Sequence, residues 1–290
     1  GIVRRTERCL FCHGSSDTGR VPGLLMQSVY TNNDGNRVFP SDSIRPRARG
    51  PLLGRWGGWF VTGTHGTQRH LGNLMIDSDE QVKLCDLSAS ANVVDLERWV
   101  DPDRYLSPHS DLVALLVLQH QVTVHNTLTA ANHRARRRLY EASIDSRSDK
   151  EPRGEQRDED LVYFDQIAEQ VVDAMLMIGD VSFSEGLSGT SEFAEQFAAQ
   201  GPFDAQGRSL RQLDLQSRLF RFPCSYLIYS TTFDRLPEPV LSSVYQRLLN
   251  VLLMKDRQDK YDGLSAADRS AILGILRATK TALPEAWHDD

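Results

Sequence analysis

The composition of the chain changes abruptly near residue 107. The first 106 residues are rich in Gly, Pro, Asn, Asp and Arg and hold only short apolar pieces, such as residues 59–61, which is typical of loops with few long elements. From Ser107 a proline and small capping residues precede a run that is apolar and then amphipathic to about Glu141, which predicts a long helix. We therefore expect a mainly α protein, with a loop-rich segment over residues 1–106 and an extended helical region over residues 107–290.

Further helices are predicted beyond this point. Apolar residues recur at three- and four-residue intervals from 161 to 178, which predicts an amphipathic helix that Gly179 would end. Helical spacing also recurs over residues 191–199, 210–220, 240–249 and 265–281, the last opened by a capping box, and residues 202–207 predict a turn. Residues 143–160 hold almost nothing apolar to bury, so we expect a mobile polar linker there.

Charge and hydropathy exclude several classes of protein. Lys and Arg number 33 against 39 Asp and Glu, a formal net charge of −6, so no nucleic-acid partner is expected. The longest apolar run, residues 112–118, is far shorter than the ~20 residues that span a membrane, so no transmembrane segment is expected in this chain. The chain begins about eight residues before its first motif, which we interpret as a processed or trimmed N-terminus.

The motif is Cys9-Leu-Phe-Cys12-His13, the C-x-x-C-H pattern that attaches haem covalently. Two thiols on one tight turn can reach the two vinyl groups of a porphyrin, and the adjacent histidine then projects beneath the ring to ligate iron. A zinc site would need two more ligands, and no second C-x-x-C exists. A redox dithiol would be expected after a strand in a βαβ unit, which the pattern does not show. The motif therefore predicts one haem c, with His13 as its iron ligand.

Residues 19–24 resemble the Gly-Pro stretch that class I cytochromes c place shortly after their haem-binding histidine. The resemblance implies a class-I-like cytochrome c segment, in which the carbonyl of Pro22 would accept the Nδ1 proton of His13 and fix the ring's orientation. An ordinary turn is the alternative interpretation of these residues.

A wider resemblance covers nearly the whole chain. Its segments are similar to a group of largely uncharacterised bacterial monohaem cytochrome-c-like proteins; they comprise residues 55–66, 68–73, 107–111, 120, 125–126, 219–229 and 283–284. The resemblance implies an exported, periplasmic haem protein with a redox protein partner, which could be a membrane-associated complex. It implies no particular reaction.

The second axial position of the iron has several candidate ligands. His65, His70 and Met75 follow the motif at roughly the distance at which class I cytochromes place their distal ligand, on a segment whose glycines permit close approach to a flat ring. His70 is the preferred candidate. His120, after the apolar run of the long helix, is a further candidate, or else a hydrogen-bonded core histidine. Met26 follows the motif too closely to reach over the ring.

Other side chains could support the cofactor. Trp56 and Trp59 could form a wall of a haem crevice and donate an indole N–H to a propionate, with plain packing as the alternative. The arginines of residues 134–138 could bind an acidic redox partner or the propionates, or could be a solvated helix face. Cys85 and Cys224 could pair in an oxidising compartment, but the sequence does not show whether they do.

Three functions are compatible with these features. The simplest is an electron carrier with one haem and two protein ligands. The chain is nearly three times as long as the ~100 residues a small monohaem carrier needs, so its helical region could instead dock into a larger redox complex. The alternative is a haem enzyme, a peroxidase or small-oxyanion reductase, with an open distal site and a histidine as acid–base catalyst.

Overall fold

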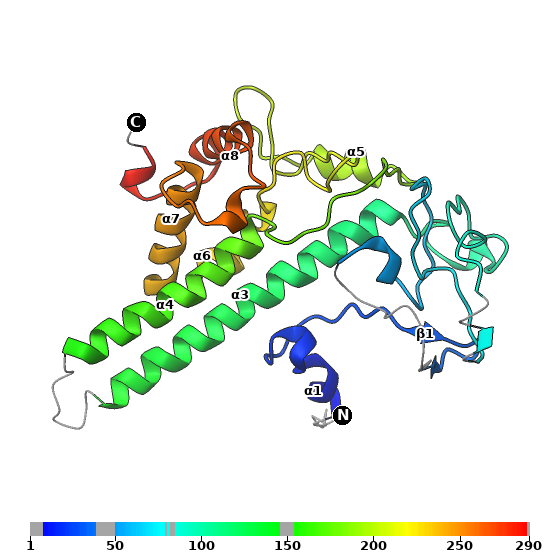
Figure 1. The fold of residues 1–290 in the computed structure, drawn as a ribbon, viewed down its shortest axis with the longest axis horizontal. Coiled ribbons are helices and arrows are strands. Elements are labelled where there is room, and N and C mark those ends of the chain that lie inside the picture. Colours follow the sequence, from blue (N-terminus) through cyan, green and yellow to red (C-terminus); the bar gives the residue numbers. More distant parts are fainter. Residues whose placement is uncertain (1–7, 39–49, 79, 82–84, 146–153, 289–290) are drawn as a thin grey trace.

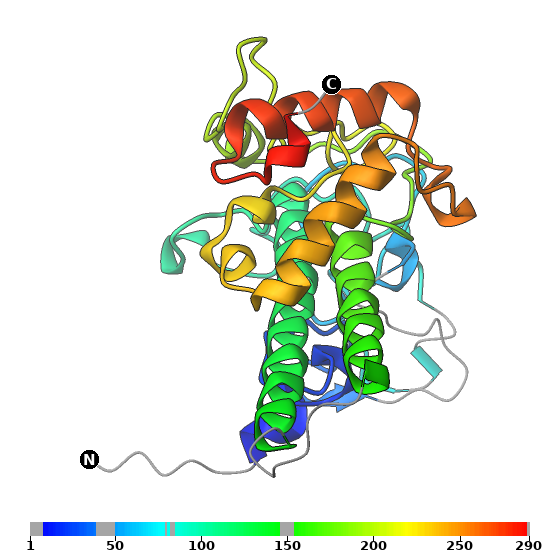
Figure 2. The same cartoon turned by 90° about the vertical axis from the view of Figure 1, so that its left-hand side faces the viewer.

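The computed structural model describes residues 8–38, 50–78, 80–81, 85–145 and 154–288 (Figures 1 and 2). The fold is mainly α, as the sequence predicts, and its long helices all follow residue 111. Before that point the described chain holds short elements joined by turns: α1 (Arg8–His13), β1 (Tyr30–Thr31), β2 (Arg37–Val38) and 3-10 turns at Ser16–Thr18, Leu52–Gly54 and Pro102–Arg104. The strands β1 and β2 form a two-stranded antiparallel hairpin.

Two long helices form the spine of the molecule. Helix α3 (Leu112–Asp145) and helix α4 (Gly154–Met175) lie side by side and antiparallel (Figure 1). Helix α7 (Glu238–Leu252) packs on α4, and α8 (Ala266–Thr279) packs on α7. The shorter elements are α5 (Phe193–Ala198), α6 (Thr231–Asp234) and 3-10 turns at Tyr226–Tyr229, Asp259–Tyr261 and Glu285–Trp287.

The hydrophobic core is divided. The larger cluster lies among α3, α4, α7 and α8 and includes Val171, Val244 and Ile275, each fully buried. A second cluster joins the start of α3 to the N-terminal segment through Leu112, Trp56 and Met26 among others. The N-terminal segment therefore packs on α3, and a third, small cluster of Tyr30, Leu71 and Ile76 lies within that segment.

The structure differs from the sequence predictions at two places. Helix α3 continues to Asp145 and α4 begins at Gly154, so the described parts of the predicted linker at 143–160 are helical; residues 146–153 lie outside the described residues. Residues 210–220 form turns and an isolated bridge between Leu213 and Phe220 instead of a helix. Apolar side chains of this segment, above all Leu210 and Phe220, pack into the core from an irregular backbone. Their positions in the sequence have the spacing of an amphipathic helix, although the backbone is not helical.

Candidate functional site

Helix α1 carries the C-x-x-C-H motif on the surface. Cys9 and Cys12, three residues apart, lie on one side of this short helix, are exposed, and take part in no disulfide. Between them, Leu10 is 54% exposed and Phe11 is 85% exposed. Exposing two large apolar side chains beside two thiols costs free energy unless an apolar group covers them.

The ring of His13 is oriented by the backbone that follows it. Its Nδ1 lies 3.0 Å from the carbonyl oxygen of Gly23, and the N–H of Gly23 donates to the carbonyl of His13 at 2.9 Å. A carbonyl oxygen only accepts, so Nδ1 carries the proton and Nε2 keeps its lone pair for a metal. The predicted acceptor, the carbonyl of Pro22, is replaced by the next carbonyl along the chain.

Gly23 is required at this position by a second contact. A Cβ on Gly23 would lie 2.6 Å from Oδ1 of Asn126, too close for any side chain without movement. Asn126, on α3, accepts from the N–H of Leu24 at 2.8 Å and donates to its carbonyl at 2.7 Å. The loop that orients His13 is thus fastened to the middle of α3.

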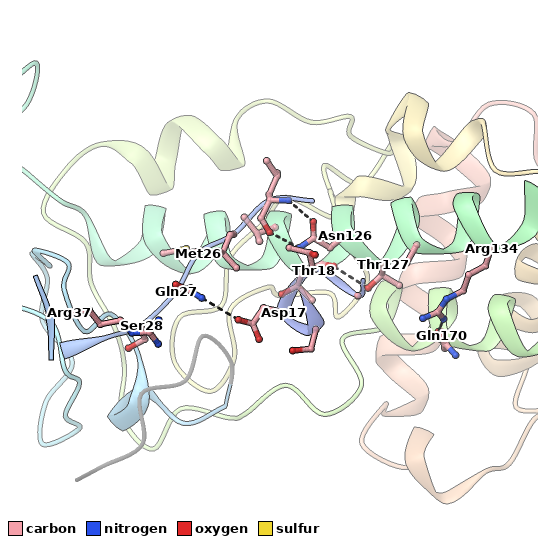
Figure 3. Close-up of a pocket in the computed structure, with 17 residues that line it drawn as sticks. Asp17, Thr18, Met26, Gln27, Ser28, Arg37, Asn126, Thr127, Arg134 and Gln170 are labelled. Carbon is pink, nitrogen blue, oxygen red and sulfur yellow. Dashed lines mark hydrogen bonds between the residues drawn. The ribbon is translucent and has the colours of Figure 1, made fainter. Parts of the chain in front are cut away.

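A cavity of about 640 Å³ opens between this loop and α3 (Figure 3). One wall is residues 16–19 and 24–28, including the buried Met26, and the other is a stripe of α3 that contains Asn126, Ala130 and Arg134. Arg37 of β2 and Gln170 of α4 also line the cavity, and Asp17 contributes a carboxylate to the lining. A volume of this size can hold a cofactor.

The predicted distal ligands His65 and His70 lie together, with their ring centroids 4.8 Å apart. Both nitrogens of His65 are engaged: Nδ1 donates to the carbonyl of Gln68 at 2.9 Å, and Nε2 accepts from the N–H of Asn92 at 3.2 Å. His70 is 2% exposed, and its Nδ1 accepts from the N–H of Gly72 at 3.0 Å. Neutral His70 therefore carries its proton on Nε2, the opposite tautomer from that of His13.

The structure does not bring these two histidines to the motif. Thr62 pairs with Ser110 and Leu112 at the start of α3, Thr64 pairs with Ser188, and Asn73 is bound back to Val61. A rise of 1.5 Å per residue separates Leu112 from Asn126, which binds the motif's loop, by about 21 Å along α3. Figure 1 shows the same separation, with α1 beside the middle of α3.

The remaining candidate ligands are also placed elsewhere. Met75 is 41% exposed on the surface. His120 is buried, its Nε2 lies 2.8 Å from Oγ of Ser225, and its ring packs edge-on against Phe220. It is therefore placed as a hydrogen-bonded core histidine, the alternative to a ligand. None of His65, His70, Met75 and His120 lines the cavity beside the motif, whereas Met26 does.

The two tryptophans support the loop indirectly. Trp59 donates its indole N–H to the carbonyl of Gln27 at 2.7 Å, so it holds the cavity's wall from behind. Trp56 is fully buried and packs edge-on against His70, with ring centroids 5.4 Å apart. Neither lines the cavity, and the buried indole N–H of Trp56 has no hydrogen-bond partner among the described residues.

The arginines of the predicted basic cluster have different partners. Arg137 pairs with Glu141 at 2.8 Å, and Arg138 pairs with Asp160. Arg136 donates to the amide of Asn132 at 2.6 Å, and Arg134 donates to the amide of Gln170 at 2.8 Å. Two of the four charges are therefore compensated by carboxylates within the chain.

The remaining two cysteines are thiols in different surroundings. Cys224 is fully buried in the larger core cluster, and burial raises the pKa of its thiol to about 12. Cys85 packs beside the small cluster around Leu71, where burial and then Asp86 raise its pKa. The structure shows no bond between them.

Sequence reasoning missed Gly23 as the acceptor for His13, Asn126 as the clamp on α3, and the cavity that ends at Arg134. The Pro22-Gly23 pair is the signal that could have found the first, because Gly permits close approach of another group to the backbone. Nothing in the sequence relates Asn126 to Leu24, which is 102 residues away.

Comparisons with known proteins identify no relative. No family model matches the chain, and no significant match was found among curated proteins or among solved structures. In the part of the chain that the structure describes, no helix is both long and apolar enough to cross a membrane. The same residues contain no cluster of three or more His, Cys, Asp or Glu side chains that could hold a metal ion.

Proposed function

We propose that this chain is a monohaem c-type cytochrome that transfers single electrons. Each thiol, of Cys9 and of Cys12, would add across one vinyl group of the haem, with a carbon–sulfur bond formed and the thiol hydrogen passed to the other vinyl carbon. Nε2 of His13 would ligate the iron. When bound, the group supplies reversible exchange between iron(III) and iron(II) with a redox protein partner.

The observation that carries this proposal is the hydrogen bond from His13 Nδ1 to the carbonyl of Gly23. It selects the tautomer that ligates through Nε2, limits rotation of the ring, and increases the ring's basicity as a ligand. The residues present also fit the group in a second respect. Leu10 and Phe11, exposed between the two thiols, offer the apolar surface that a porphyrin joined at both ends of this turn would cover.

The chain's remaining residues would protect and position the cofactor. The loop after His13 is held by hydrogen bonds from Asn126 and from Trp59. These bonds would restrain the backbone that orients His13, the iron ligand. Haem c is attached outside the cytoplasmic membrane, so the proposal includes export, to the periplasm in a bacterium. The helical region would serve as a docking platform for a redox complex.

A haem enzyme is the second candidate, and one observation favours it. His65, His70 and His120 are each engaged in hydrogen bonds away from the cavity, and Met75 is exposed. A sixth coordination position without a protein ligand would admit peroxide or a small oxyanion. Carbon monoxide distinguishes the two functions, because a reduced carrier with two protein ligands resists the gas and an open site binds it.

Covalent attachment is tested by producing the chain with a haem c maturation system and extracting it with acidified organic solvent. Wild-type protein is expected to keep its haem and give a haemochrome spectrum of haem c. Cys9→Ala combined with Cys12→Ala is expected to release all of it, and His13→Ala to keep the haem but lose the wild-type spectrum of the ligated iron. Cys85→Ser is the matched control and should retain the haem. Extraction of the haem from the wild type would refute the proposal.

A further inference from the structure

The cavity beside α3 is separate from the haem motif. None of residues 9–13 lines it; its walls are the loop after the motif and a stripe of α3, with Arg37 of β2 and Gln170 of α4. Its volume of about 640 Å³ is in the range of small-molecule sites. The chemistry of its own lining therefore indicates what it binds.

Two opposite charges line this cavity and are held by neutral amides. Oδ2 of Asp17 accepts from Nε2 of Gln27 at 3.3 Å, and Nη1 of Arg134 donates to Oε1 of Gln170 at 2.8 Å (Figure 3). Within the described chain neither charge forms an ion pair, whereas Arg137 on the same helix does. Hydrogen bonds between two ionised groups are stronger than those to an amide, so each charge favours a ligand group of opposite sign.

The two charges are spaced along α3. A Cβ on Gly23 would lie 2.6 Å from Oδ1 of Asn126 and 3.0 Å from Cβ of Thr18, so the turn that carries Asp17 lies at the level of Asn126. Arg134 follows Asn126 by eight residues, which is about 12 Å at 1.5 Å per residue. Figure 3 shows Arg134 farther along α3 than Asn126. A ligand that contacts both charges must therefore be elongated.

We infer that the cavity binds an elongated zwitterion, with its ammonium group at Asp17 and its carboxylate at Arg134. A guanidinium donates two parallel N–H bonds to a carboxylate, which an amide oxygen cannot accept in the same way. A free α-amino acid carries both charges on one carbon, whereas a tripeptide, at about 3.5 Å per extended residue, separates them by roughly the required length. Short peptides and ω-amino acids share this chemistry. The inference does not depend on the haem and goes beyond the proposed function.

Isothermal titration calorimetry of the full chain with trialanine tests the inference. The wild type is expected to bind trialanine more tightly than N-acetyl-trialanine or trialanine amide, each of which lacks one charge. The expected difference is roughly two- to five-fold for each, as for an exposed ion pair. Alanine should bind more weakly than trialanine. 6-Aminohexanoate keeps both charges without peptide groups, so binding as tight as that of trialanine identifies an ω-amino acid site and weaker binding identifies a peptide site.

Substitutions assign each charge to its residue. Asp17→Asn is expected to abolish the difference between trialanine and its acetylated form, and Arg134→Gln the difference between trialanine and its amide. Arg136→Gln is the matched control, because this arginine lies on the same helix and does not line the cavity, and it should keep both differences. A circular dichroism melt of each variant establishes that the fold is unchanged.

Several results would overturn the inference. They are equal binding of trialanine and its amide to the wild type, no binding of trialanine at all, and loss of the carboxylate preference in Arg136→Gln. Loss of that preference in Arg37→Gln while Arg134→Gln keeps it would also do so, because Arg37 lines the cavity from β2. Retention of haem by the wild type is measured separately and decides only the proposed function.

Discussion

At the scale of single residues, His65 and His70 show what burial does to an imidazole. The pKa of His70 is lowered to about 3, chiefly by burial and then by the neighbouring His65 and Arg69, because a charged ring there would be both desolvated and repelled. Burial also lowers the pKa of His65, with the carbonyl of Gln68 opposing that effect. The pair is therefore neutral in the folded protein at physiological pH, and its two rings pack together and hydrogen-bond to the surrounding backbone.

The lowered pKa predicts how stability depends on pH. The unfolded state takes up a proton at His70 near pH 6.5, whereas the folded state does so only near pH 3, so the folded state loses stability as pH falls between these values. One such group contributes up to about 1.4 kcal/mol per pH unit. His70→Gln is expected to make urea unfolding measurably less pH-dependent between pH 6.5 and 4.5.

The control for this prediction is His133→Gln, an exposed position on α3, which should keep the wild-type dependence. If both variants lose stability with pH as steeply as the wild type, burial of His70 is not the cause.

At the scale of elements, one carboxylate organises the start of α3. Asp111 directly precedes the helix, and its Oδ1 accepts from the backbone N–H groups of Val113 and Ala114 at 2.8 and 3.1 Å. Its Oδ2 accepts from the N–H groups of Thr190 and Ser191 at 2.8 and 2.9 Å, and from the Ser191 hydroxyl at 2.8 Å. Asp111 is thus both the cap of α3 and the clamp that binds a distant loop to it.

Removing this carboxylate is expected to be costly. Asp111→Ala leaves four backbone N–H groups and a hydroxyl without their acceptor in a buried place, so we expect a loss of roughly 2–4 kcal/mol in the free energy of unfolding. Denaturant unfolding measures the loss. Asp95→Ala, at an exposed turn, should change the same quantity by less than about 0.5 kcal/mol. A similar cost at both positions would contradict the role assigned to Asp111.

At the scale of the whole molecule, stability and the proposed chemistry lie in different regions. The larger core cluster is built from α3, α4, α7 and α8, and ion pairs join these elements at its edge, for example Arg247 with Asp165 at 2.5 Å. Helix α1 buries none of the motif's side chains. The site therefore lies where the chain has little packing of its own, supported by a rigid helix beneath the loop.

Hydrogen exchange can test this division. In protein without haem, the amides of α7 are expected to exchange only through global unfolding, because Val240, Val244 and Leu248 are fully buried along it. The amides of α1 are expected to exchange faster by orders of magnitude. Mass spectrometry of peptides from both helices gives the comparison, with α8 as a second protected element. Protection of α1 as strong as that of α7 would show that the two regions unfold as one.

Local signals in the sequence were sufficient for much of the fold. The apolar spacing predicted α4 and α7, and Ser265 with Asp268 predicted the capping box of α8, in which both reciprocal hydrogen bonds form. These features depend on residues three or four apart, which helical geometry alone brings together. The same reasoning failed at residues 210–220, where apolar residues meet the core from turns, because spacing alone does not distinguish a helix from an irregular segment that buries the same side chains.

The sequence by itself determined the C-x-x-C-H motif, and with it the chemistry that the side chains of α1 can carry out. Only the tertiary structure decided which groups surround it. The acceptor for His13 is Gly23, the clamp is Asn126, and the cation at the end of the cavity is Arg134, while His70 belongs to the segment that pairs with the start of α3. The reason is that the number of residues between a side chain and the motif sets only the largest possible distance between them. It does not determine the path that the backbone takes. Packing of the loop and of residues 54–73 along α3 sets those positions.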